Sequence, residues 1–135
     1  MATHPYLHFD GTCAEALGFY AETFGGTNLQ MMRYGEGPEM QGAAGSARVM
    51  HGQLTIGDGT LMASDAPEGQ AGAPQASVSV MQSAPDMATG QRWFDALAAG
   101  GAVAVPFGPA FFAQGFGMVR DRFGTHWMIA VSGTT

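Results

Sequence analysis

One stretch decides the fold: Phe116-Gly117-Met118-Val119-Arg120-Asp121-Arg122-Phe123-Gly124-Thr125-His126-Trp127-Met128-Ile129-Ala130-Val131. Met118-Val119 predicts a first strand, Asp121 to Gly124 a tight turn, and Thr125 to Val131 a second strand rich in β-branched and aromatic residues. The stretch from His51 to Ala63 repeats this order of strand, glycine turn and strand. A hairpin that occurs twice in one chain indicates a duplicated module.

The first module spans about residues 5–64. The sequence predicts a strand over 6–9, a helix ending at Phe24, and further strands over 29–34, 48–56 and 60–64. Thr12 and Glu15 have the spacing of a capping box at the start of the helix, and Gly25-Gly26 suit its end. The glycine-rich segment 35–45 predicts a loop.

The second module spans about residues 75–131 and follows a linker over about 65–74. We expect a strand over 76–80, a helix over 86–99, a strand over 102–106 that Pro106 ends, and a loop over 107–114. Phe19, Gly25 and Gly26 recur 75 positions later as Phe94, Gly100 and Gly101. The sequence thus predicts one α+β domain over 1–135, made of two βαβββ modules whose curved mixed sheets surround a cup-shaped cleft.

Composition narrows the choice of partners. The chain has five Arg, no Lys and eleven acidic residues, and its formal net charge of −6 argues against nucleic acid and anionic membranes as partners. A single cysteine excludes an internal disulfide framework. The first residues lack a signal-peptide pattern, and no apolar run is long enough for a membrane span. We therefore expect a soluble, cytoplasmic protein.

The chain also resembles a known family. It is similar to the vicinal-oxygen-chelate superfamily of glyoxalase I, bleomycin-resistance proteins and extradiol dioxygenases, and most of all to its PhnB-like branch. The matching segments are Tyr6 to Gly11, Phe19-Tyr20, Phe24 to Gly26, Tyr34 to Glu36, His51, Leu61 to Asp65, Phe116 to Met118, Asp121 to Gly124 and Trp127-Met128. The resemblance implies paired βαβββ modules, a cup-shaped ligand site and a homodimer. Whether the modules pair within one chain or swap between chains stays open.

The same resemblance defines where metal ligands would lie, namely on the first and last strands of each module. His8 fits the first position, but the others fall on Met62 or Ser64, on Ser77 or Ser79, and on Met128. Thioethers and hydroxyls bind Zn²⁺, Ni²⁺ or Mn²⁺ poorly, so we expect neither the usual metal site nor another cofactor. His51 could join His8 in a divalent metal site only with help from Asp10 or Asp65.

The ligand-binding cleft is predicted from the strands and from the aromatic residues. Phe111, Phe112 and Phe116 line or cover the cup and stack on a planar ligand in one interpretation, and belong to the core and a dimer contact in the other. Cys13 lies on the apolar face of the first helix and is expected to be a buried structural residue. The full predicted set is Tyr6, His8, His51, Gln53, Ser64, Ser77, Ser79, Phe111, Phe112, Phe116, Trp127 and Met128.

Two functions remain open at this point. The first is a protein that binds a small planar, cationic or neutral molecule without metal. The second is a metal-dependent glyoxalase-type lyase or isomerase, or a dioxygenase-like enzyme, that uses His8 and His51. The quinone methyltransferase label sometimes given to PhnB-like chains is disfavoured, because the first strand is not followed by a glycine-rich nucleotide-binding turn.

Overall fold

The computed structural model describes residues 1–34, 47–70 and 72–132. The chain divides into two compact units, Met1–Ala73 and Pro74–Thr135, and each is described by itself. The predicted loop over 35–45 lies outside the described residues. Among the described residues, no helix is both long and apolar enough to cross a bilayer.

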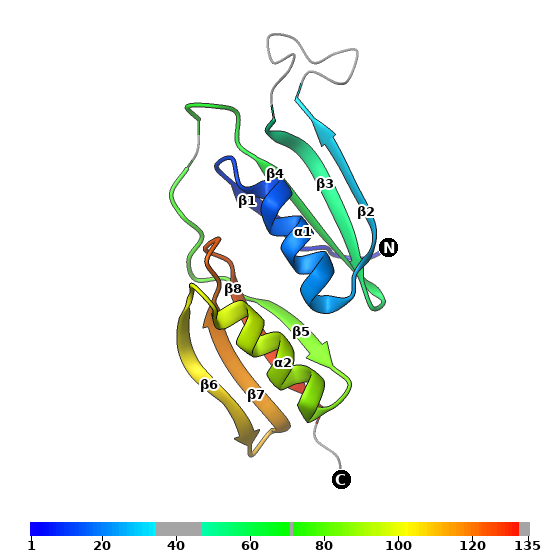
Figure 1. Ribbon diagram of the computed structural model, residues 1–135, viewed down its shortest axis with the longest axis vertical. Helices are drawn as coiled ribbons and strands as arrows, with labels where there is room; N and C mark the ends of the chain where they lie inside the picture. Colours follow the sequence, from blue (N-terminus) through cyan, green and yellow to red (C-terminus); the bar gives the residue numbers. More distant parts are fainter. Residues whose placement is uncertain (35–46, 71, 133–135) are drawn as a thin grey trace. The chain divides into compact units, whose positions relative to one another are not determined.

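The first unit is a four-stranded mixed sheet with a helix packed on one face (Figure 1). Its elements are β1 (Tyr6–Phe9), α1 (Cys13–Phe24), β2 (Thr27–Arg33), β3 (Val49–Ile56) and β4 (Gly59–Asp65). The strand order is β1-β4-β3-β2, with β1 parallel to β4 and the other pairs antiparallel. Residues alternate along β1, so Leu7 and Phe9 enter the core beside α1, whereas Tyr6 and His8 lie on the open face.

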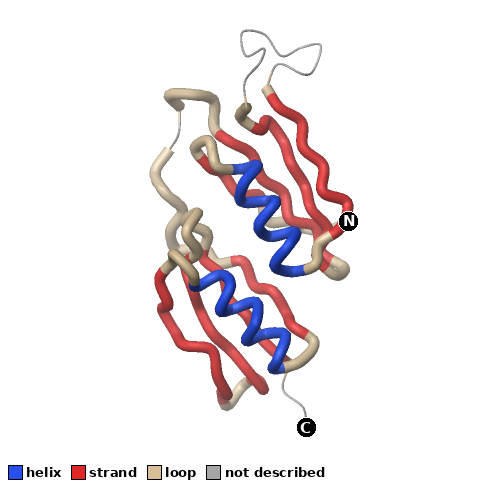
Figure 2. The backbone as a smooth tube through the Cα atoms, viewed as in Figure 1, coloured by secondary structure: helices blue, strands red, loops and turns tan. Residues whose placement is uncertain are grey.

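The second unit repeats this plan (Figure 2). Its elements are β5 (Val80–Ala84), α2 (Met87–Ala98), β6 (Ala102–Ala110), β7 (Ala113–Arg120) and β8 (His126–Val131), and the strand order is β5-β8-β7-β6. The core between α2 and the sheet contains Phe94, Leu97, Val119, Trp127 and Ile129. The predicted α+β fold of two βαβββ modules is therefore confirmed.

The glycines that end the helices show the duplication at the level of the backbone. Gly25 has a φ of 67° and Gly100 a φ of 76°, and such left-handed values suit glycine. Gly26 follows the first and packs close to Leu54, while Gly101 follows the second and packs close to the backbone of Arg120. The repeat found in the sequence thus marks two helix ends, but their conformations differ: Gly25 is itself the left-handed C-cap of α1, whereas the C-cap of α2 is the extended Ala99, one residue before Gly100.

Two predicted strands have different limits in the structure. Residues 76–79 are not a strand, because Ser77 has a φ of 63° and pairing with β8 begins only at Val80. Pro106 does not end β6, which continues to Ala110. β6 is an edge strand with irregular pairing to β7, and an edge tolerates a residue that lacks an amide donor.

Two further segment boundaries differ from the predicted ones. Residues 107–114 are not a loop but the continuation of β6, the turn at Phe111-Phe112 and the start of β7. Asp65 is the last residue of β4 and is 1% exposed, so the linker begins after it.

Candidate functional site

A polar and aromatic cluster lies on the open face of the first sheet. Tyr6 and His8 come from β1, and His51 and Gln53 from β3. The Tyr6 hydroxyl is 2.9 Å from His51 Nδ1, and His51 Nε2 is 3.2 Å from Gln53 Oε1. The ring centroid of Tyr6 lies 5.3 Å from that of His8 and 5.6 Å from that of His51. We call these four residues the β1–β3 cluster.

The hydrogen bonds of the cluster select one tautomer of the neutral His51 ring. An amide oxygen can only accept, so Nε2 donates to Gln53 Oε1. In the neutral ring Nδ1 then accepts the hydroxyl proton of Tyr6. Both nitrogens are therefore used within the cluster, and His51 presents the faces of its ring rather than a lone pair.

The described residues bring few metal-ligating groups to this cluster. Within the described ranges there is no group of three or more His, Cys, Asp or Glu side chains that could hold an ion. The two carboxylates considered as additional metal ligands form other interactions: Asp10 pairs with Arg48 at 2.8 Å, and Asp65 accepts backbone amides. Two imidazoles, one of them with both nitrogens bonded, are too few for a site that normally needs three or four protein ligands.

Ser64 lies beside the cluster but faces little solvent. It is the register partner of His8 across the β1–β4 pair and is 7% exposed. Ser64 therefore lies beneath its neighbours on the open face and presents little surface to a ligand.

Asp65 was missed as a key residue, because its place in the sequence suggested a linker. One carboxylate oxygen accepts the amides of Gly11 at 2.7 Å and Cys13 at 3.0 Å, and the other accepts the amide of Val49 at 2.9 Å. The Tyr34 hydroxyl donates to the Asp65 carbonyl at 2.8 Å. Asp65 thus joins the end of β4 to the start of α1 and to β3, which fixes the strands that hold the β1–β3 cluster.

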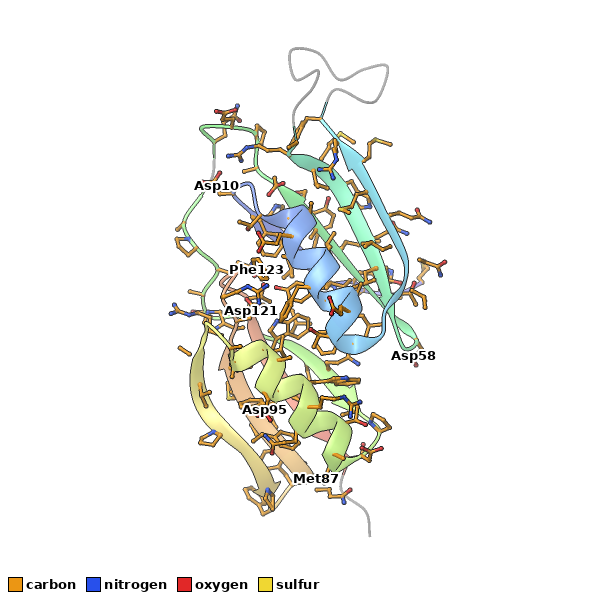
Figure 3. The ribbon with its side chains drawn as sticks, viewed as in Figure 1. Asp10, Asp58, Met87, Asp95, Asp121 and Phe123 are labelled. Atoms are coloured by element: carbon orange, nitrogen blue, oxygen red, sulfur yellow. The ribbon has the colours of Figure 1, made fainter. Side chains whose placement is uncertain are left out.

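Arg48 and Asp10 close the same end of the unit (Figure 3 labels Asp10). Arg48 Nη1 also donates to the carbonyl of Ala66 at 2.9 Å. The pair is part-exposed, so it contributes position more than stability.

Cys13 is buried at the first residue of α1, as predicted. Burial, followed by the nearby negative charge of Asp65, raises the pKa of its thiol to about 12. A thiol that stays protonated at neutral pH is a poor nucleophile, so Cys13 has a structural role.

The residues predicted from the second module do not form one group. Ser77 precedes β5 in an exposed turn, and Phe111 and Phe112 occupy the β6–β7 turn, with Phe111 fully exposed. Phe112 contacts Phe116 edge to face, with ring centroids 5.0 Å apart. The aromatic residues 111 and 112 therefore form the tip of a hairpin.

Trp127 and Met128 lie on opposite faces of β8, because neighbouring residues in a strand alternate. Met128 is half-buried on the open face, whereas Trp127 is 1% exposed in the core and cannot line the open face with it. The Trp127 indole donates to Asp121 Oδ2 at 2.9 Å. Asp121 Oδ1 accepts the amides of Phe123 and Thr125, so this aspartate organises the β7–β8 turn (labelled in Figure 3).

A family model described as 3-demethylubiquinone-9 3-methyltransferase matches residues 2–130. The chain belongs to this family. Protein YjdN from Escherichia coli is 34% identical to this family member, over 97% of the chain and 95% of YjdN.

Several solved structures resemble this chain over nearly its whole length. Protein PA1353 from Pseudomonas aeruginosa is 38% identical, with a TM-score of 0.88 over 98% of both chains. A PhnB protein from Bacillus cereus, 21% identical, has a TM-score of 0.74 over 98% of this chain and 100% of its own. A glyoxalase/bleomycin resistance protein from Albidiferax ferrireducens, 14% identical, has a TM-score of 0.69 over 98% and 99% of the two chains. This family member thus has the fold of the PhnB protein and of the glyoxalase/bleomycin resistance protein.

Proposed function

We propose that this PhnB-like protein binds a small planar molecule on the open face of its first sheet, without a metal ion. The observation that carries the proposal is the β1–β3 cluster, in which both ring nitrogens of His51 are occupied by Tyr6 and Gln53. The cluster offers aromatic faces and polar edges, which suit stacking and hydrogen bonding. A net charge of −6 favours cationic or neutral ligands over acids at this face.

Methyl transfer, which the description of the family names, is not supported by the chain itself. β1 is followed by a single glycine, Gly11, before α1 begins. A nucleotide-type cofactor is usually held by a glycine-rich turn at such a strand–helix junction. We therefore assign binding, and not methyl transfer, to this site.

The test is a titration with a planar aromatic cation, proflavine, followed by the ¹H–¹³C resonances of the aromatic rings. Saturable shifts of the Tyr6, His8 and His51 signals are expected. The variant His51→Phe keeps a ring but removes both hydrogen bonds, and should weaken binding by about tenfold. His126→Phe makes a comparable change in the second unit and serves as the control. Equal affinity in both variants would contradict the proposal.

A second titration tests the metal-dependent alternative. We expect no stoichiometric heat with Zn²⁺, Ni²⁺ or Mn²⁺ in protein purified without a histidine tag. Stoichiometric binding that is lost in His8→Ala would overturn the metal-free proposal. It would instead favour a glyoxalase-type lyase or isomerase, or a dioxygenase-like enzyme.

We also propose that the protein is a cytoplasmic homodimer. Two features support an association of copies: the exposed Phe111 and Phe112, and the lack of any charged residue between Asp95 and Arg120. Two chains that each carry a charge of −6 repel least where such an uncharged segment lies at the contact.

A further inference from the structure

The second unit contains a hollow of about 230 Å³ whose lining includes no residue of the β1–β3 cluster. It lies where β6 and β8 begin and β7 ends. Ala102 and Met118 contribute apolar side chains, and Arg120, His126 and Ser79 contribute polar groups. The hollow is small, so it suits a compact ligand.

Arg120 is the distinctive group in this hollow. Its guanidinium makes no hydrogen bond or ion pair with any residue that the structure describes. By contrast, Arg48 pairs with Asp10, and Arg122 lies over the ring of Phe123 at 4.6 Å. Among the described residues, Arg120 is thus a cation without a carboxylate partner, next to an apolar surface.

His126 is held in place at the same hollow. Its Nε2 lies 3.2 Å from the carbonyl of Gln75, and a carbonyl can only accept, so Nε2 carries a proton and donates. The ring is therefore oriented by the backbone, and the Ser79 hydroxyl adds a group that can donate or accept.

We propose that this hollow binds a small organic acid, with its carboxylate at Arg120 and a compact apolar body against Ala102 and Met118. A guanidinium matches a carboxylate through two parallel hydrogen bonds. Most of the lining is apolar, which favours an acid with a hydrocarbon or aromatic body over a free inorganic anion. The site is independent of the ligand proposed for the first unit, so either can fail without the other.

Benzoate is the probe, and the indole N–H signal of Trp127 is the reporter in ¹H–¹⁵N spectra. Trp127 lines the hollow and its indole is hydrogen-bonded to Asp121, whereas Trp93 on α2 does not line it and serves as an internal reference. We expect a saturable shift of Trp127 with little change at Trp93. Benzamide, which has the same size and no charge, should bind about tenfold more weakly.

Arg120→Gln should reduce benzoate affinity by about tenfold, because it removes the charge that pairs with the carboxylate. Arg92→Gln removes the same charge from the exposed surface of α2 and should leave affinity within about twofold. An unchanged Trp127 signal in the absence of benzoate shows that Arg120→Gln is folded. Equal affinity in the two variants, equal affinity for benzamide, or no saturable shift would each overturn the proposal.

Discussion

Two buried aspartates hold together the turns of this protein, one in each unit. The Asp65 carboxylate accepts three backbone amides and that of Asp121 accepts two amides and an indole N–H. Each carboxylate satisfies donors that folding removes from water. A buried carboxylate of this kind stabilises the fold only while all its donors remain paired.

Asp65→Asn should destabilise the protein by about 3 kcal/mol. The amide keeps the shape of the side chain, but its NH₂ group would face a backbone donor instead of accepting from it. Urea unfolding gives the change in the free energy of unfolding. Asp58→Asn, in the exposed β3–β4 turn, is the control and should change it by less than about 0.5 kcal/mol. Equal effects of the two substitutions would contradict the role given to Asp65.

Cys13 should make the protein sensitive to alkali. The pKa of its thiol is about 12 in the folded state against an ordinary value of 9.0. Between these pH values the thiol therefore ionises in the unfolded chain but not in the folded protein. The stability that the thiol contributes is complete below pH 9 and is lost as the pH rises towards 12. The slope should be about 1.4 kcal/mol per pH unit at most, and should be absent from Cys13→Ala. Parallel slopes in both proteins would show that other groups cause any alkaline loss.

At the scale of elements, the two helices begin in different ways. The capping box predicted at Thr12 does not form, because its side chain makes no capping hydrogen bond; Asp65 instead accepts the amide of Cys13, the first residue of the helix. α2 begins instead with a local cap, in which Asp86 Oδ1 accepts the Thr89 amide at 2.7 Å. This bond lowers the pKa of Asp86.

Asp86→Ala should therefore lower stability at neutral pH, and Thr12→Ala should have a smaller effect. Because the folded-state pKa of Asp86 is depressed, its contribution is present above the ordinary value of 3.8 and is lost as the pH falls through the folded-state value. Thermal unfolding between pH 2 and pH 7 should show the wild-type and Asp86→Ala curves converging in acid. A difference that persists undiminished at the lowest pH would argue against a charge-dependent cap.

Close packing of α2 on its sheet depends on glycines in β7. A Cβ atom at Gly117 would lie 2.7 Å from Phe94 Cε1 and 2.8 Å from the Cα of Phe107, so the backbone would have to move. Gly117→Ala should cost about 1–3 kcal/mol. Gly108→Ala, in the partner strand of the same hairpin, meets no atom within 4 Å and should be close to neutral. Chemical denaturation compares the two, and equal costs would refute the packing explanation.

The elements were predictable where local chemistry decides them. Glycine at the helix ends and the alternation along β1 identified the helices and the face that carries Tyr6 and His8. Errors arose where tertiary pairing decides, as at Pro106, which an edge strand tolerates, and at Ser77, where alternation suggested a strand. The bonds of Asp65 link residues 16 to 54 positions apart, a distance that no local pattern reveals.

At the scale of the whole molecule, the proposed homodimer predicts a mass of twice the 14.0 kDa of one chain. Light scattering coupled to size-exclusion chromatography measures this mass. Phe112→Ser, at the half-exposed tip of the β6–β7 hairpin, should shift the mass towards that of one chain. Leu29→Ser removes a comparable exposed apolar side chain from β2 and is the control. A single-chain mass for the unaltered protein would rule out the dimer.

The different caps of the two helices bear on the order in which the chain folds. α2 acquires its cap from a residue next to it, so this helix can nucleate from local contacts alone. α1 must wait for Asp65, 52 positions beyond Cys13, and closing so long a loop costs entropy before any contact rewards it. The φ-value of Asp86→Ala should therefore exceed that of Asp65→Asn. The two units would then fold in a different order although they share one architecture. In the second unit α2 forms early from local contacts, whereas in the first unit α1 forms late, after Asp65 at the end of β4 has come into place.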